Sequence, residues 1–162
     1  MATLIELVRR GELHLVDPGL GPREFPERKL YVTNELLRWI EDHLYEMESA
    51  MGVEQAPTEQ FDDLTYSFVR GDRIPVDKFF KCLRPSDRGV WELKTVDLRL
   101  FGWFHSKDCF IATHCDCATK IKNHGLYAGY RDASVTKRDA IDLDEPKFVN
   151  GSDADDVVSD SY

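Results

Sequence analysis

Three strand-like runs lie close together in the middle of the chain and limit its possible folds more than any other feature. They cover residues 90–96, 98–105 and 109–115 and are rich in β-branched and aromatic side chains, which favour strands. Residues 106–108, between the last two runs, have the length of a hairpin loop. We therefore predict a largely antiparallel sheet at the centre of the protein.

Helical patterns flank these runs in the sequence. The predicted helices cover residues 3–10, 34–51, 75–83 and part of 132–143. The helix over 34–51 is the clearest, because its apolar side chains recur at helical spacing and Thr33 or Asn34 can cap its start. Ser134 is the predicted cap of the last helix.

Residues 64–69 alternate in polarity and are predicted to form a fourth strand. The polar stretch 117–129 is interpreted as a loop, and 150–162 is too poor in large apolar groups to order itself. This order of elements is typical of an α+β protein. The predicted parts are an N-terminal helical extension over 1–60, an α+β core over 61–145 and an acidic disordered tail over 146–162.

Charge is distributed unevenly along the chain. The net charge is −9, yet residues 61–141 carry 14 basic and 11 acidic side chains. Residues 1–60 carry 6 basic and 12 acidic side chains, and residues 142–162 carry 1 and 7. An uneven distribution of charge indicates which partners a protein can bind more than it indicates how the chain folds. A net-acidic protein is a poor binder of nucleic acid, whereas the basic middle taken alone is compatible with that role.

Composition indicates the cellular location of the protein and whether it holds a metal ion or cofactor. No apolar run approaches the 18–20 residues or so that a membrane span needs, and acid occurs already at Glu6, so we expect a cytoplasmic protein without a signal peptide or a membrane partner. The four cysteines are Cys82, Cys109, Cys115 and Cys117. Their spacing does not form the paired sets of zinc sites. We expect no metal and no cofactor.

The run 98–105 has two different faces, because side chains alternate along a strand. One face consists of Leu98, Leu100, Gly102 and Phe104, and the other of Arg99, Phe101, Trp103 and His105. The second face can hold phosphate with Arg99 and contact bases with Trp103 and His105, as in proteins that bind single-stranded RNA. Alternatively, its aromatic rings form a second core face and Arg99 pairs with a carboxylate. Both interpretations remain open.

Residues with acid–base and phosphate chemistry gather after the third run. They are Lys120, Lys122, His124 and Tyr127, followed by Tyr130 and Arg131 as further candidates for RNA binding. Lysine, histidine and tyrosine transfer protons and neutralise phosphate charge in many sites. The alternative is a solvated loop that contains a few lysines.

Four short motifs resemble the RelE superfamily, especially the phage-derived HigB-like branch of type II toxins. They are Trp91-Glu92-Leu93-Lys94, Leu98-Arg99-Leu100-Phe101, Phe110-Ile111-Ala112-Thr113-His114 and Thr119-Lys120-Ile121-Lys122. The resemblance covers residues 61–141. It implies a small twisted antiparallel sheet of about four strands, with helices packed on one side.

The same resemblance implies a function. Many members of the family cleave mRNA on the ribosome without metal, through attack of a ribose 2′-OH on the adjacent phosphate, and are neutralised by an antitoxin protein. Lys94 and Arg99 would then stabilise the phosphate. The candidates for the remaining catalytic roles are Lys120, Lys122, His124 and Tyr127, without an assignment of acid and base. The alternative is a non-catalytic protein- or nucleic-acid-binding module on the same scaffold, which the negative net charge favours.

Overall fold

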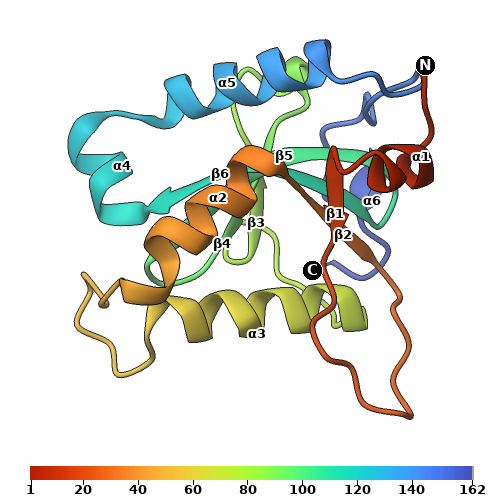
Figure 1. The fold of residues 1–162 in the computed structure, drawn as a ribbon. Helices are drawn as coiled ribbons and strands as arrows, with labels where there is room; N and C mark the ends of the chain where they lie inside the picture. Colours follow the sequence, from red (N-terminus) through yellow and green to blue (C-terminus); the bar gives the residue numbers. More distant parts are fainter. Residues whose placement is uncertain (162) are drawn as a thin grey trace.

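A computed structural model describes residues 1–161 and shows one open sheet of six strands (Figure 1). The strands are β1 (Leu13–Leu15), β2 (Lys29–Thr33), β3 (Phe80–Cys82), β4 (Trp91–Lys94), β5 (Leu98–Ser106) and β6 (Cys109–Cys117). Their order across the sheet is β1-β2-β6-β5-β4-β3. The α+β class is confirmed, whereas the predicted number of about four strands is too low.

The two additional strands at one edge come from the N-terminal region, which the sequence predicts to be a helical extension. β2 pairs in parallel with β6, and every other neighbouring pair in the sheet is antiparallel. The predicted hairpin at 106–108 is confirmed, since β5 and β6 are joined there and pair over most of their lengths. The sheet is therefore largely antiparallel, with one parallel junction between its N-terminal and central strands.

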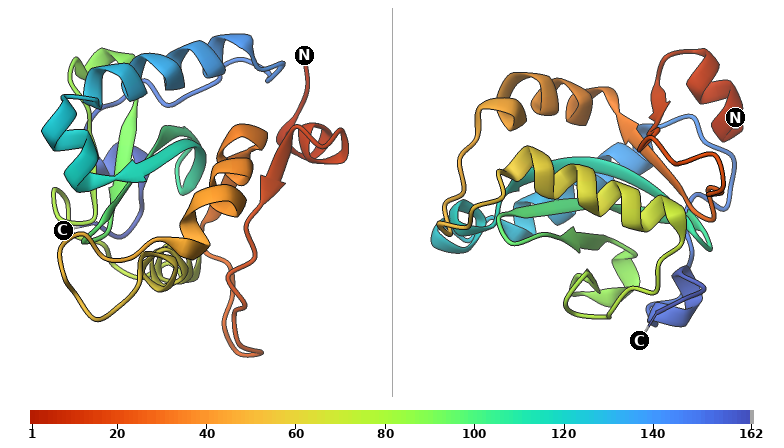
Figure 2. Two further views of the ribbon diagram at one scale, coloured as in Figure 1. Left: turned by 60° about the vertical axis from the view of Figure 1, so that its left-hand side comes forward. Right: turned by 90° about the horizontal axis from the view of Figure 1, so that it is seen from below.

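Helices cover both faces of the sheet rather than the one side that the family resemblance implies. They are α1 (Leu4–Arg9), α2 (Asn34–His43), α3 (Pro57–Arg70), α4 (Ala118–His124), α5 (Tyr127–Ala140) and α6 (Ala154–Val157), with 3₁₀ turns η1 (Leu44–Glu46) and η2 (Ser86–Arg88). Figures 1 and 2 show α3 and α5 on opposite sides of the sheet. Both faces of the central strands are consequently largely buried.

The alternation predicted along the central strand is confirmed by the two cores. Leu98, Leu100 and Phe104 belong to the core under α2 and α3. Phe101 and Trp103 face the opposite way and are completely buried. These two aromatic rings therefore pack inside the protein, as the second interpretation of this face predicts.

The alternating segment 64–69 is part of α3 and not a strand. Pro57 occupies the first turn of this helix and Gly71 ends it in a left-handed conformation. Phe61, Leu64 and Phe68 recur at helical spacing and are buried against the sheet. The helical pattern over 14 residues therefore outweighs the local β-propensity of six.

Four further predictions about helices and loops change. The helix predicted over 34–51 starts as expected, with Thr33 as its cap, but α2 ends at His43. Residues 80–82 form β3 beside β4 instead of the end of a helix. The predicted loop 117–129 contains α4 and the start of α5. Ser134 is not a cap: it is buried in the middle of α5, where its hydroxyl hydrogen-bonds Thr113 at 2.6 Å.

The C-terminal segment packs on the sheet, whereas its composition predicts disorder. Val157 and Val158 are completely buried in the core under α3. The Asp108 N–H donates to the Val157 carbonyl oxygen at 2.8 Å, and its carboxylate accepts from the Ser159 N–H at 2.9 Å. Two buried valines and backbone hydrogen bonds thus order a segment whose average composition is polar. The last residue of the predicted tail, Tyr162, lies outside the described residues.

A β-bulge interrupts the register of β5 and β6 beside Gly102. Phe101 is paired with His114 and Gly102 with Ala112, so Thr113 is the extra residue. A Cβ atom on Gly102 would lie 1.9 Å from the Ile111 carbonyl oxygen. Only glycine allows this close approach of the two strands.

We predict that Gly102→Ala lowers the free energy of unfolding by about 1–3 kcal/mol, because the added methyl group forces the two strands apart. Gly129→Ala is the matched control: its Cβ would meet nothing within 4 Å, and alanine in a helix is expected to stabilise by about 0.5–1 kcal/mol. Urea unfolding followed by circular dichroism measures both variants. Equal stability of the two variants would contradict the role of the bulge.

We also predict that Val157→Ala together with Val158→Ala destabilises the protein by about 2–4 kcal/mol, since both side chains leave a packed core. Val53→Ala together with Val96→Ala provides a control with the same chemical change at exposed positions, and is expected to stay within about 0.5 kcal/mol of wild type. Thermal unfolding distinguishes the two pairs. A tail that does not contribute to the core would give the same result for both.

Candidate functional site

Charged side chains from four neighbouring strands meet on the sheet face that α4 and α5 cover. Lys81 on β3 is opposite Glu92 on β4, Lys94 on β4 is opposite Arg99 on β5, and Arg99 is opposite Asp116 on β6. Residues that are opposite each other in a sheet share a face. We call these five residues the charged cluster.

Glu92 is the most buried carboxylate of the cluster, with 3% of its surface exposed. Its Oε1 atom lies 3.6 Å from the Lys94 ammonium group. Its Oε2 atom is buried and accepts no hydrogen bond from any described residue. Burial raises the pKa of Glu92 above its usual value, although the charges of Lys94, Arg99 and Lys81 oppose the shift. The carboxyl group therefore holds a proton more readily than an exposed glutamate.

Arg99 is also incompletely paired. One terminal nitrogen donates to the Thr95 and Leu98 carbonyl oxygens at 2.6 and 2.9 Å, but Nε is buried and has no hydrogen-bond partner within residues 1–161. A buried donor or acceptor that lacks a partner costs about 1–3 kcal/mol. The cluster contains one unpaired donor, Nε of Arg99, and one unpaired acceptor, Oε2 of Glu92. Such groups are rare in native proteins, and a catalytic or ligand-binding role is one explanation for them.

Asp116 connects the cluster to the two helices above it. Its Oδ2 atom lies 3.2 Å from the Lys120 ammonium group on α4 and also accepts a hydrogen bond from the Tyr130 hydroxyl on α5. Burial and this hydrogen bond both raise the pKa of Tyr130. The Tyr130 ring stacks on Phe101 with centroids 5.0 Å apart, and Tyr127 meets the same ring edge-on. These contacts fix α4 and α5 over the cluster.

The structure brings only some of the predicted site residues together. Lys94, Arg99, Lys120 and Tyr130 lie in or beside the charged cluster, while Tyr127 packs on Phe101. Lys122 and His124 are exposed on α4. Trp103 is completely buried, and its indole N–H donates to the Lys147 carbonyl oxygen at 3.0 Å. His105 lies near the opposite end of β5 from Arg99.

Glu92, Lys81 and Asp116 are absent from the residues that the sequence singles out. Glu92 precedes Lys94 by two positions, which places both side chains on one face of a strand. That spacing is the feature of the sequence that points to Glu92 as a site residue. Lys81 has no such signal, because the sequence predicts a helix where β3 forms.

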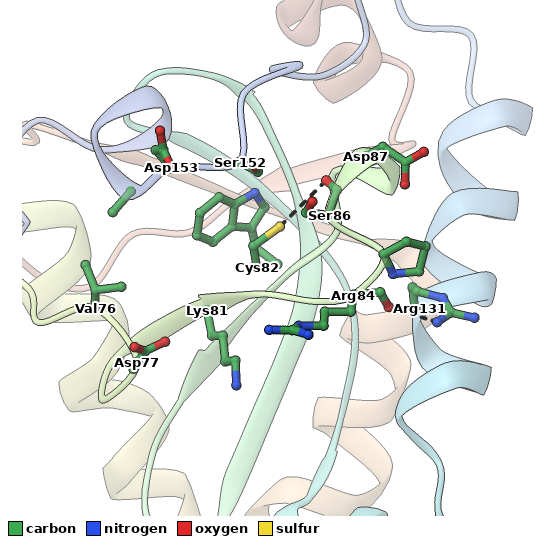
Figure 3. A pocket seen from close by; sticks show the side chains of 13 residues that line it. Val76, Asp77, Lys81, Cys82, Arg84, Ser86, Asp87, Arg131, Ser152 and Asp153 are labelled. Atoms are coloured by element: carbon green, nitrogen blue, oxygen red, sulfur yellow. Dashed lines mark hydrogen bonds between the residues drawn. The ribbon is translucent and has the colours of Figure 1, made fainter.

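An open pocket of about 940 Å³ adjoins the cluster at the β3 edge of the sheet (Figure 3). Figure 3 shows the side chains of Lys81, Arg84 and Arg131 on the side opposite Ser152 and Asp153. Lys81 belongs to both the pocket and the cluster. Asp77, Asp87 and Asp153 also line the pocket, so its positive side is balanced by separate acids.

Neither a metal site nor a membrane span is found in the part of the chain that the structure describes. Among residues 1–161, no three His, Cys, Asp or Glu side chains are arranged to hold a metal ion. No helix in this range is long and apolar enough to cross a bilayer.

Comparisons of the chain with protein-family models, curated proteins and solved structures found no match. The geometry of the site is therefore what bears on its function.

We predict that Glu92→Gln makes the protein more stable at neutral pH. A raised folded-state pKa means that stability is highest below the usual pKa of glutamate and declines as the pH rises through the folded value. Glutamine removes that decline, whereas Glu41→Gln at an exposed position of α2 should leave it unchanged. Urea unfolding between about pH 4 and 8 measures how the free energy of unfolding of each variant changes with pH. A steeper decline in Glu92→Gln than in wild type would contradict the direction of the shift.

Proposed function

We propose that this chain binds single-stranded RNA through its phosphate groups and cleaves it without a metal ion, with the charged cluster as the catalytic centre. The observation that supports this most directly is the incomplete pairing of Glu92 and Arg99. A carboxylate with a free oxygen and a guanidinium with a free N–H lie on one sheet face beside Lys94. The resemblance of the segments around Trp91 and Arg99 to RelE-like ribonucleases points to the same reaction.

In the proposed reaction the ribose 2′-OH attacks the adjacent phosphorus. The Glu92 carboxylate takes the proton of this hydroxyl, and a bond forms between O2′ and phosphorus. The bond between phosphorus and O5′ breaks, and the Lys120 ammonium group gives a proton to the departing oxygen. The products are a 2′,3′-cyclic phosphate and a 5′-hydroxyl. Arg99 and Lys94 neutralise the charge that develops on the phosphoryl oxygens.

The open pocket is the proposed entry for RNA. Lys81, Arg84 and Arg131 provide three cations for successive phosphates. Lys81 is exposed and lies directly opposite Glu92, so a strand held at this side chain approaches the catalytic centre. A ribosome-bound mRNA and a neutralising antitoxin protein remain the proposed physiological partners.

A second candidate function is binding without cleavage. It is favoured by burial, since Glu92 and Arg99 are only 3% and 9% exposed and a substrate must displace neighbouring side chains to reach them. The net charge of −9 also opposes tight binding of nucleic acid at physiological salt. In this case the pocket alone contacts the RNA or protein partner.

The experiment is a binding and cleavage assay with a labelled single-stranded RNA in the presence of EDTA. Lys81→Ala together with Arg84→Ala is expected to weaken binding about tenfold and to reduce the slope of log affinity against log salt by about 1.4, which corresponds to two phosphate contacts. Lys107→Ala, at an exposed turn away from the pocket, is the control. Glu92→Gln should bind RNA like wild type and yield no cyclic phosphate.

Each result decides between the two candidates. Binding without cyclic-phosphate products by wild type contradicts catalysis and supports the binding module. No RNA binding at low salt, or the same loss in Lys107→Ala as in the pocket variant, contradicts RNA as the partner in both candidates and leaves only a protein partner for the pocket.

A further inference from the structure

A second cavity, of about 480 Å³, lies near the opposite end of β5 from the charged cluster. It is open to solvent and is bordered by the first residues of α1, by β2, by the end of β5 and by the segment 143–146. Its apolar side chains include Leu4, Ile5 and Leu143. Its volume is within the range of small-molecule sites, and it shares no lining residue with the pocket at β3.

Several polar groups in this cavity have no partner within the protein. Lys29 is exposed, and its ammonium group makes no hydrogen bond or ion pair with any residue in 1–161. The Tyr31 hydroxyl also has no hydrogen-bond partner in this range, on a side chain that is 4% exposed. His105 has a buried Nδ1 atom without a hydrogen-bond partner among these residues. A buried polar atom such as His105 Nδ1 is normally satisfied. Lys29 is exposed to solvent, and because neither it nor the Tyr31 hydroxyl is held by another residue, both are available to a ligand.

The cavity contains charges of both signs that do not neutralise each other. Lys29 lines it together with Asp144 and Glu145, yet no ion pair joins the lysine to either acid in the described chain. A ligand with only a carboxylate would be repelled by the two acids. A ligand with only an amine would be repelled by Lys29. A ligand with both groups satisfies all three side chains.

We propose that this cavity binds a free apolar α-amino acid of the size of leucine or phenylalanine. Lys29 and the Tyr31 hydroxyl hold the carboxylate, and Asp144 holds the ammonium group. The ligand's side chain packs against Leu4 and Leu143, which exclude water from it. This inference does not depend on the proposed reaction with RNA, because the two sites use different residues.

The first test is isothermal titration calorimetry of the full chain with L-leucine and L-phenylalanine. We expect a dissociation constant below about 1 mM for at least one of them. Two analogues each lack one charge: 4-methylpentanoate has no ammonium group, and 3-methylbutylamine has no carboxylate. Both are expected to bind at least about tenfold more weakly than leucine, because each leaves a charged group of the cavity unpaired.

The second test uses variants at the charged positions. Lys29→Gln and Asp144→Asn are each expected to weaken leucine binding about tenfold, and Tyr31→Phe by a smaller factor, since it removes a neutral hydrogen bond. The controls are Lys107→Gln and Asp139→Asn, which make the same chemical changes at exposed positions outside the cavity. Circular dichroism confirms that each variant is folded.

Three results would overturn the proposal. They are the absence of heat with about 10 mM of either amino acid, equal affinity for leucine and one of its singly charged analogues, and wild-type affinity in both Lys29→Gln and Asp144→Asn. RNA cleavage by the same protein is measured separately, so failure of one proposal is distinguishable from failure of the other.

Discussion

The ion pair between the buried Arg28 and the partly exposed Asp108 joins four parts of the chain that are far apart in sequence. The Arg28 Nε atom donates to Asp108 at 3.3 Å, and its other nitrogens donate to the Phe68 and Asp72 carbonyl oxygens at the end of α3. Asp108, in the β5–β6 turn, accepts from Ser159 in the C-terminal segment. Loss of one partner would leave a buried charge uncompensated, at a cost of about 3–5 kcal/mol. The parallel pairing of β2 with β6 starts at this junction, where the Lys29 N–H donates to the Asp108 carbonyl oxygen at 2.9 Å.

The face under α5 is divided by the β-bulge at Thr113. On one side of the bulge, Phe101 packs under Tyr130 beside the charged cluster. On the other side, Trp103 and Ile111 belong to a separate core with α1. The extra residue keeps apolar side chains directed into a core on both sides of the irregularity. One strand can therefore support a charged site near its start and a cavity with polar and apolar lining near its end, with the buried rings of Phe101 and Trp103 between them.

The sequence predicts the central hairpin and the two faces of β5 correctly, because alternation over nine residues is a strong local signal. It also predicts a cap at Thr33 or Asn34, and the structure uses Thr33; a cap depends on one side chain and the backbone beside it. It is wrong at 64–69, where a short alternating stretch lies inside a longer helical pattern, and at 75–83, where pairing with β4 makes the strand. In the site, Arg99 is predicted from the alternation along its strand, and Lys94 only from the resemblance to RelE-like proteins. Glu92 has a sequence signal in its spacing from Lys94, whereas Lys81 becomes a candidate only once β3 is placed beside β4.

By itself, the sequence determined the α+β class, the central antiparallel strands and the presence of a basic segment between acidic flanks, since these depend on local pattern and composition. The tertiary structure decided which strands are neighbours, that helices cover both faces, and that the tail is packed by Val157 and Val158. It also decided which charges meet. Burial removes water from Glu92 and brings cations beside it, and a change of this kind arises only from contacts between residues that are distant along the chain.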